Sequence, residues 1–328
     1  MSDPVPVPGR LGSRPLGSSG LRVSPLGLGL AALGRPAYIN LGRDQDLGPD
    51  RSVRSMQRRC HQVLDAAWDA GVRYLDAARS YGLAESFLAR WLASRPEAAE
   101  AVVGSKWGYA YTGRWRLDAS VHEVKDHSAA ALRRQLAETL ATLGPRLSLY
   151  QIHSVTPDSP VLGDPEVLGE LARLRERGLA VGLSVSGEGQ AEVIDAVVAA
   201  GQGPFQVVQA TWNLLEPSAG PALQRARQAG LGVIVKEALA NGRLAGRGAC
   251  PEPLAQVAAR HQVGPDAVAL AAALAQPFAD VVLSGAATPA QLASNLAATG
   301  LHLDASDTAC LAGLATDPAS YWAERRRL

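Results

Sequence analysis

The sequence predicts an α/β protein, a (β/α)8 TIM barrel preceded by an N-terminal β-hairpin. Eight short runs rich in Val, Ile and Leu alternate with longer amphipathic stretches, which is the pattern of βα units feeding a parallel sheet. Three of the amphipathic stretches end at Gly71, Gly178 and Gly230, directly before the next apolar run. Short turns at one end and longer loops at the other are typical of a closed barrel. An open doubly wound sheet is disfavoured, because residues 26–30 lack the third glycine of its fingerprint.

The elements are expected in a fixed order. Residues 12–24 form two short strands around a Ser/Gly turn, a hairpin that closes the bottom of the barrel. The eight barrel strands begin near Leu26, Val72, Ala101, Leu147, Ala180, Phe205, Gly232 and Asp280. Residues 31–50 form a long loop above the first strand, and long loops in compact domains tend to carry function. Residues 300–328 follow the barrel as a C-terminal tail that ends in a solvated run of arginines.

Helix boundaries are predicted from capping residues and apolar spacing. Asp164 before Pro165 is typical of a helix start, and Thr288 with Gln291 predicts a capping box. Residues 128–143 have leucines at i, i+4, i+8 and i+11, which predicts one apolar stripe. That stripe consists of Leu132, Leu136, Leu140 and Leu143.

The composition is that of a folded protein with small-molecule partners. The 328 residues include 32 Lys and Arg against 31 Asp and Glu, so there is no surplus of cations for nucleic acid or an anionic membrane. Hydrophobic residues make up 47% of the chain, enough for a large core. No charge block or low-complexity tract divides it, so we expect a single domain over residues 1–328. Its oligomeric state stays open.

Cysteine usage and the N-terminus favour a cytoplasmic protein. Cys60, Cys250 and Cys310 are an odd number, lie far apart and match no metal-ligand spacing. Residues 1–20 contain no apolar leader core, and no uncharged run approaches the roughly 20 residues that span a bilayer. We therefore expect neither secretion nor membrane insertion.

Polar residues follow three successive predicted strands, where a parallel barrel exposes them at one mouth. The second strand supplies Asp76 and Tyr81, the third Lys106 and the fourth His153. An ammonium beside a phenol stabilises the phenolate and lowers the pKa of the Tyr, while the Asp keeps the Lys charged. A neutral His then positions a carbonyl oxygen. Each residue alone has an ordinary structural explanation, but the four together predict one catalytic site.

A known family shows the same set of residues. Residues 71–78, followed by Tyr81, Gly82 and Glu85, resemble the first signature of the aldo-keto reductase superfamily. The resemblance covers nearly the whole chain, from about residue 14 to residue 295, and it also places Lys106 and His153 at the family's catalytic positions.

The resemblance implies an activity and a role for each residue. The activity is reversible hydride transfer between a nicotinamide coenzyme and an aldehyde or ketone. Tyr81 is then the general acid and base, Lys106 and Asp76 tune it, and His153 orients the substrate.

The resemblance also implies coenzyme contacts. Ser184, Gln209 and Asn213 match polar positions around the nicotinamide carboxamide, although Val185 follows Ser184 where Asn is common. Lys236 stands where many members have an aromatic ring. The full implied set is Ser184, Gln209, Asn213, Lys236, Leu239, Gly242, Arg243, Gln291 and Asn295, the last two in the adenosine-phosphate motif.

The form of the coenzyme depends on the adenosine end. Many members have Arg at the position of Ala287 or Gln291 to hold the 2′-phosphate of NADP, and this chain has neither. The family's habit favours NADP(H), with Arg243 or Arg247 as a substitute cation, and NAD(H) is the alternative.

The substrate pocket is expected to be aromatic. Four aromatic residues crowd into the loop after the third strand, namely Trp107, Tyr109, Tyr111 and Trp115. Trp107, and Tyr38 in the long loop, are the candidate substrate contacts. Such a wall fits a small to medium carbonyl or alcohol, partly apolar or sugar-like.

Two alternatives stay open, and no metal is expected. His122, Lys125, Asp126 and His127 resemble a metal site in composition only, and hydride transfer needs none. The first alternative is a Schiff-base lyase or aldolase with Lys106 or Lys236 as the amine, disfavoured because Asp76 should keep Lys106 protonated. The second is a non-catalytic NADP(H)-binding sensor subunit.

Overall fold

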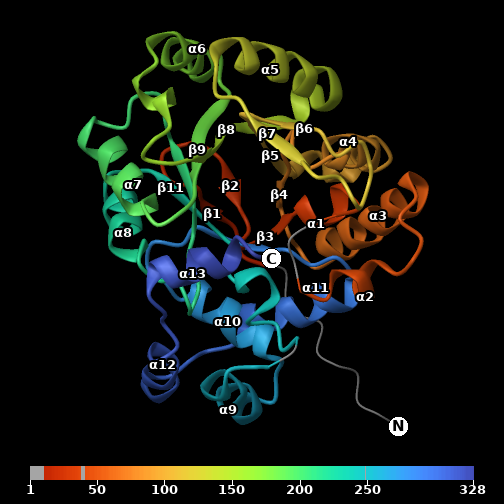
Figure 1. Cartoon of the computed structure of the whole chain (residues 1–328), viewed down its shortest axis with the longest axis vertical. Helices are drawn as coiled ribbons and strands as arrows, with labels where there is room; N and C mark the ends of the chain where they lie inside the picture. The colour runs from red at the N-terminus through yellow and green to blue at the C-terminus, as the bar shows by residue number, and fades with distance from the viewer. Residues whose placement is uncertain (1–10, 38–40, 248) are drawn as a thin grey trace.

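A computed structural model of the chain describes residues 11–37, 41–247 and 249–328, and it confirms the predicted barrel. Eight parallel strands close in the order β10-β11-β12-β3-β4-β5-β8-β9 (Figure 1). They are β3 (Leu26–Gly29), β4 (Tyr74–Asp76), β5 (Val102–Trp107), β8 (Leu147–Val155), β9 (Ala180–Val185), β10 (Val207–Thr211), β11 (Gly232–Lys236) and β12 (Val281–Ser284). Each strand begins within two residues of a predicted start.

Helices surround the barrel as an outer ring (Figure 1). The α-helices are α1 (Ala31–Gly34), α2 (Arg43–Leu47), α3 (Val53–Asp69), α4 (Ala84–Ala93), α5 (Ala129–Leu143), α6 (Pro165–Glu176), α7 (Gln190–Ala199), α8 (Gly220–Gln228), α9 (Glu252–His261), α10 (Pro265–Leu274), α11 (Pro289–Leu296), α12 (Ala305–Ala312) and α13 (Pro318–Arg325). Short 3-10 turns are η1 (Pro96–Glu100), η2 (Gly144–Arg146), η3 (Pro160–Gly163), η4 (Ala240–Gly242) and η5 (Ala297–Gly300). In the described part of the chain, none of these helices is long and apolar enough to cross a membrane.

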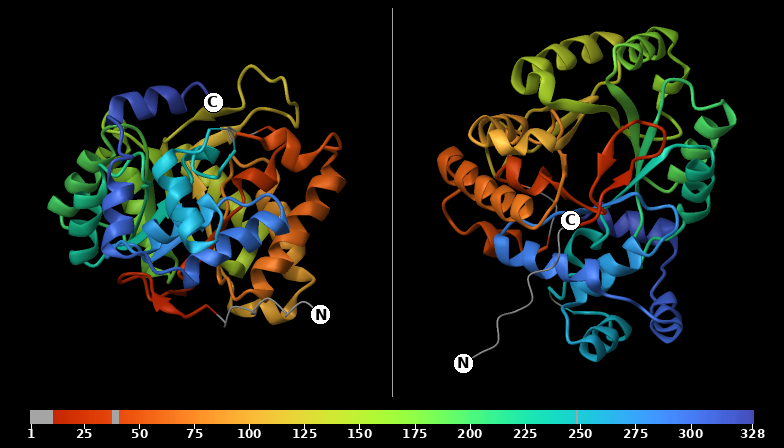
Figure 2. Two further views of the ribbon diagram at one scale, coloured as in Figure 1. Left: turned by 90° about the horizontal axis from the view of Figure 1, so that it is seen from below. Right: turned by 180° about the vertical axis from the view of Figure 1, so that it is seen from behind.

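The predicted N-terminal hairpin closes one end of the barrel. β1 (Arg14–Pro15) pairs antiparallel with β2 (Arg22–Val23), and the backbone N–H of Ser18 donates to the carbonyl of Gly230 at 2.9 Å. The turn passes so close to β11 that a Cβ at Gly17, whose φ is +50°, would collide with the backbone of Gly232. Figure 2 shows this hairpin at the end of the molecule opposite α13.

Helix starts agree with the predicted caps, with one difference in detail. The Asp164 side chain accepts from the N–H of Glu166 at 2.9 Å, and Thr288 Oγ1 accepts from that of Gln291 at 3.2 Å. The predicted capping box is only half formed, because Gln291 Oε1 accepts from the N–H of Ala287 rather than that of Thr288.

Three leucines of the predicted stripe on α5, Leu132, Leu136 and Leu143, pack in or against the core, but the buried face also includes polar residues. Leu140 is 43% exposed, whereas Gln135 and Thr139 are buried. The reason is polar: Gln135 Oε1 accepts from the N–H of Gly108 at 3.0 Å, and Thr139 Oγ1 donates to Glu85 at 2.9 Å. The buried face of this helix therefore supports the loop after β5 and the buried carboxylate of Glu85 in α4.

Alternation along the strands determines what the barrel contains. Inward residues at the hairpin end are mostly apolar and pack with Leu16 and Val23 of the hairpin. At the carboxyl ends the same inward register presents polar groups, as expected for a barrel whose strands point to one mouth. These groups are Asp76, Lys106, His153, Gln209 and Lys236.

The mouth is overlaid by two segments, and the predicted C-terminal tail is one of them. A hairpin of β6 (Tyr109–Tyr111) and β7 (Glu123–Lys125) lies at this end, together with α13 (Figure 2). The arginine run is not merely solvated: Arg325 forms two hydrogen bonds with Glu237, at 2.7 and 2.5 Å. Residues 300–328 thus form helices α12 and α13, and α13 is attached to the barrel.

Candidate active site

Asp76 and Lys106 form a buried ion pair at the carboxyl ends of β4 and β5. Lys106 Nζ donates to Asp76 Oδ1 and to the carbonyl of Ala77, the latter at 3.0 Å. Asp76 Oδ2 accepts from Tyr74 Oη and Gln209 Nε2, each at 3.0 Å. Both charges are buried, and such a pair is tolerated only when its remaining polar atoms are hydrogen-bonded. The pair is therefore held in place by hydrogen bonds at the bottom of the site.

Tyr81 and His153 lie above this ion pair. The Tyr81 ring centroid is 5.0 Å from Lys106 Nζ and 5.5 Å from the centroid of the His153 ring, which meets it edge-on at 81°. The structure thus brings together all four residues that the sequence predicts as catalytic.

The protonation of Tyr81 differs from the sequence-based expectation. Burial, followed by the nearby charges of Asp76 and Glu123, raises the pKa of Tyr81 well above its usual value, while Arg35 opposes the shift. The net lowering that the sequence predicts is wrong for this structure, because burial and the carboxylates of Asp76 and Glu123 outweigh the nearby cations. The Tyr81 phenol therefore stays protonated and has a proton to donate.

His153 is held neutral. Burial and the charges of Lys106 and Lys236 lower its pKa well below the usual value. Its Nδ1 lies 3.3 Å from Ser80 Oγ, and its backbone carbonyl accepts from His127 Nε2 at 2.8 Å. A neutral imidazole fixed in this way suits a hydrogen-bond donor rather than a proton carrier.

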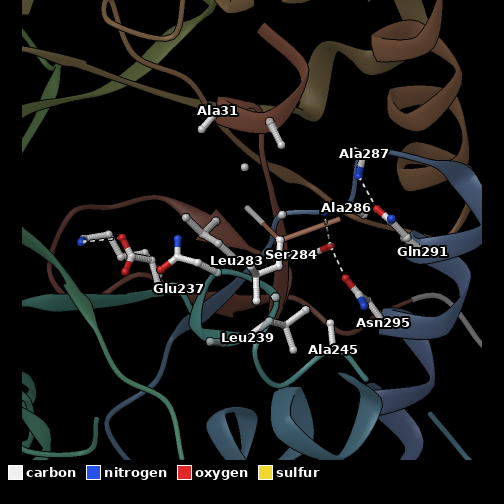
Figure 3. A pocket seen from close by; sticks show the side chains of 18 of the residues that line it. Ala31, Glu237, Leu239, Ala245, Leu283, Ser284, Ala286, Ala287, Gln291 and Asn295 are labelled. Carbon is white, nitrogen blue, oxygen red and sulfur yellow. Dashed lines mark hydrogen bonds and ion pairs between the residues drawn. The ribbon is translucent and has the colours of Figure 1, made fainter. Parts of the chain in front are cut away.

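A cavity of about 650 Å³ extends from this cluster to α11. Figure 3 shows Glu237 on one side and Gln291 and Asn295 on the other, with Leu283 and Ser284 between them. The wall is built from small residues, among them Ala31, Ala245, Gly285, Ala286 and Ala287. Such a wall lets a flat, elongated ligand lie close to the backbone, and the volume is that of an ordinary ligand site.

The α11 end of the cavity is an ordered polar network. Ser284 Oγ donates to Asn295 Oδ1 at 2.7 Å, and Asn295 Nδ2 donates to Asp266 Oδ2 at 2.7 Å. Two of the predicted coenzyme residues, Gln291 and Asn295, therefore line the cavity. Arg247 also lines this end, paired with Asp46 at 2.6 Å.

The predicted coenzyme residues at the strand ends divide into two groups. Gln209, Lys236, Leu239 and Gly242 line the cavity. Lys236 Nζ donates to Thr211 Oγ1 at 3.0 Å, and burial lowers its pKa to about 8.

The other group does not line the cavity, and each member has a different partner. Ser184 Oγ accepts from the N–H of Ser154 at 2.8 Å. Asn213 binds the backbone of its own turn and donates to Tyr321 Oη of α13 at 2.9 Å. Arg243 pairs with Glu324 at 2.8 Å and lies over the Tyr321 ring. In this structure these three residues support the loops and α13.

None of the four aromatic residues predicted for the substrate wall lines this cavity. Trp107 is completely buried, packs edge-on against His127 at 5.9 Å, and does not line the cavity. Tyr109 packs on His153 instead, with ring centroids 5.2 Å apart. Tyr38 lies outside the described residues. The aromatic ring nearest the catalytic His is therefore that of Tyr109 or Tyr81.

Some lining residues were not predicted. Arg35 pairs with Glu123 at 3.0 Å, and Glu237 pairs with Arg325, all four lining the cavity. Glu237 directly follows Lys236 at the end of a strand, so its place at the mouth could have been predicted from the sequence. Glu123 and Arg325 lie far in sequence from their partners Arg35 and Glu237, so neither ion pair could be predicted from a local pattern.

Comparisons with known proteins agree with this geometry. The sequence model of the Aldo/keto reductase family matches residues 25–315. The chain is 26% identical over 236 residues to the aldo-keto reductase ausK of Emericella nidulans, covering 70% of this chain and 56% of that protein. It is 31% identical over 164 residues to the pyridoxal 4-dehydrogenase of Microbacterium luteolum, covering 43% of each. The chain thus spans about half the length of these relatives.

One solved structure supports the fold. It is an aldo-keto reductase from Bacillus halodurans in its holo form, which superposes with a TM-score of 0.71. The match covers 94% of this chain and 97% of that one, at 22% identity.

Proposed function

The chain belongs to the aldo/keto reductase family, and we propose that it catalyses reversible hydride transfer between a nicotinamide coenzyme and an aldehyde or ketone. The observation that carries this proposal is the buried Asp76–Lys106 pair with the rings of Tyr81 and His153 beside it, at one end of the cavity. Burial raises the pKa of Tyr81 and lowers that of His153. Ion pairs are common in barrels, but this set with opposite pKa shifts on acid and donor is typical of a catalytic site.

In the proposed mechanism each residue of this site has one task. The coenzyme, when bound, supplies hydride to the carbonyl carbon in reduction and accepts it in oxidation. Tyr81 donates its phenolic proton to the carbonyl oxygen, so that aldehyde or ketone becomes alcohol. His153 donates a hydrogen bond to the same oxygen, and Lys106 stabilises the phenolate that remains. In oxidation the phenolate of Tyr81 takes the proton back from the alcohol.

The cavity fits a dinucleotide. Small residues along residues 283–290 and the turn at η4 leave room for a long, flat molecule. We place its nicotinamide near Lys236 and Gln209 and its adenosine near Gln291 and Asn295, as the family resemblance implies. NADP(H) is favoured by that resemblance, with Arg247 rather than Arg243 as the cation near the adenosine end, and NAD(H) is the alternative.

A coenzyme titration tests this placement. NADH and NADPH are each titrated into the parent chain and into Ala287→Arg, following coenzyme fluorescence. We expect the new guanidinium to tighten NADPH relative to NADH roughly tenfold or more, because a charge-assisted hydrogen bond contributes about 1.5 to 3 kcal/mol. Ala287→Gln is the uncharged control and should leave the ratio within about twofold of the parent. Failure of both coenzymes to bind the parent below millimolar concentration would refute the proposed function, and an unchanged ratio would place the adenosine elsewhere.

A Schiff-base lyase is the second candidate, because one lysine has the required chemistry. Burial lowers the pKa of Lys236 to about 8, which leaves part of its amine unprotonated near neutral pH. Lys106 does not qualify, since its ammonium is held by Asp76 and the Ala77 carbonyl. The rest of the site, with an acid and a neutral donor, favours hydride transfer.

A further inference from the structure

A second phenol lies directly beneath the catalytic carboxylate. Tyr74 precedes Asp76 by two residues on β4, so both side chains point into the barrel. The Tyr74 ring is completely buried, and its hydroxyl donates to Asp76 Oδ2 at 3.0 Å. Tyr74 packs with the apolar residues of the barrel floor and does not line the cavity, so neither substrate nor coenzyme reaches it.

The neighbouring strands leave space for this ring. On β5, a Cβ at Gly104 would collide with the Tyr74 hydroxyl. On β3, a Cβ at Gly27 would lie 2.9 Å from Cδ1 of the Tyr74 ring. Glycine therefore stands at the interior position on both strands that flank β4. The Tyr74 ring fills the space that these glycines leave, and its hydroxyl points at Asp76. A residue that served packing alone would have no need of that hydroxyl, since Phe fills the same volume.

The Tyr74 hydroxyl is a hydrogen-bond donor toward Asp76. Burial and the neighbouring Asp76 charge raise the pKa of Tyr74 well above its usual value, so the phenol stays protonated. Asp76 therefore has three donors, from three strands: Lys106 Nζ, Gln209 Nε2 and Tyr74 Oη.

We propose that Tyr74 is a positioning residue that withdraws charge from Asp76 and thereby makes Tyr81 a stronger acid. This inference rests on the proposed function, because it assigns Tyr74 a role in the proton step at Tyr81.

The direction in which the Tyr74 hydroxyl shifts the pKa of Tyr81 follows from electrostatics. The Asp76 carboxylate raises the pKa of Tyr81, and a hydrogen bond to a carboxylate spreads its negative charge onto the donor. Removing the Tyr74 hydroxyl therefore strengthens the negative field at Tyr81 and raises its pKa further. At any given pH less phenolate is available to oxidise an alcohol, and the phenol is a weaker acid for reducing a carbonyl.

Other charged groups also face Tyr81 and must be held constant in a test. Lys106 of β5 and His153 of β8 lie against its ring. The remaining groups that act on it come from four further segments and are Arg35, Glu123, Asp76 and Glu237. A substitution at Tyr74 changes none of these residues.

The test compares Tyr74→Phe with Tyr150→Phe. Tyr150 is an equally buried phenol, but it belongs to the cluster between the barrel and the helices. We expect Tyr74→Phe to shift the acidic limb of kcat/KM for alcohol oxidation upward by roughly half a pH unit to one unit, since one unit corresponds to about 1.4 kcal/mol. The kcat for carbonyl reduction should fall roughly threefold to tenfold, with KM and coenzyme affinity within about twofold of the parent. Tyr150→Phe should leave the limb in place.

The outcomes separate the two proposals. An active parent whose acidic limb does not move in Tyr74→Phe would overturn the role of Tyr74 and leave the proposed function standing. A parent without carbonyl reduction would overturn both. If Tyr74→Phe does not fold, Tyr74→Met replaces it, because Met fills the site without a hydroxyl. The same acidic limb of kcat/KM for alcohol oxidation is then measured for Tyr74→Met. Gly104→Ala, which displaces the hydroxyl but keeps the phenol, should move the limb in the same direction.

Discussion

Tyr81→Phe is expected to abolish carbonyl reduction while leaving coenzyme binding nearly unchanged. The phenol is the proton donor of the proposed site, and a general acid typically contributes about 100-fold to 10,000-fold in rate. Its ring contacts His153 and faces the Lys106 ammonium rather than the α11 end, so the affinity for the coenzyme should stay within about threefold of the parent. Steady-state reduction and coenzyme fluorescence titration measure the two effects separately.

Tyr109→Phe is the matched control for that experiment. Tyr109 is the other phenol packed on His153, with centroids 5.2 Å apart, and it has no role in the proposed proton step. It should keep most of the activity. If Tyr81→Phe retained a rate comparable to that of Tyr109→Phe, the assignment of the acid would be wrong even though the fold is right.

Lys106→Met is expected to reduce both stability and turnover. Removing one partner of a buried pair leaves Asp76 charged and uncompensated, which typically costs about 3 to 5 kcal/mol in the free energy of unfolding. Loss of the ammonium also removes a positive charge near Tyr81 and so raises its pKa. Reduction should fall by about 100-fold, and oxidation, which needs the phenolate, should recover in part only at alkaline pH.

Urea unfolding and the pH profile of oxidation measure these two consequences. Lys125→Met is the control, because Lys125 lies on the mouth hairpin and bonds to Thr156 and Ser159 near the surface. That variant should lose less than about 1 kcal/mol. A Lys106→Met protein as stable and as active as the Lys125→Met control would show that the ammonium is not part of the site.

The barrel and the four central residues were predictable from sequence for one physical reason. Parallel strands point to a single mouth, so residues at the ends of consecutive strands must converge there, whatever the loops do. Asp76, Lys106 and His153 are inward residues at such ends, and Tyr81 follows Asp76 closely in the chain.

Hydrogen-bonding roles were less predictable than positions. Asn213 stands at a family position, but its amide is used by its own turn and by α13, a helix about a hundred residues away in sequence. The Glu237–Arg325 pair likewise depends on where the C-terminal helix docks. No local pattern of sequence encodes contacts of that range.

The predicted direction of the pKa shift of Tyr81 was wrong for a related reason. The sequence shows which cation lies nearby, but the direction of the shift depends on burial and on carboxylates such as Glu123, which the mouth hairpin brings in. Tyr74 is the opposite case, since its inward register two residues before Asp76 is visible in the sequence. The role that we propose for it also depends on Gly27 and Gly104 of the flanking strands, which leave space for its ring.

The most direct test of hydride transfer follows the hydride itself. NADH and NADPH deuterated at the transferring position of nicotinamide C4 are mixed with the protein and a set of small aliphatic, aromatic and sugar aldehydes and ketones. The proposed mechanism predicts an alcohol with deuterium on the former carbonyl carbon, formed by the parent and not by Tyr81→Phe. Products without deuterium from every carbonyl, together with a substrate fixed on Lys236 or Lys106 by borohydride, would contradict it and favour the lyase.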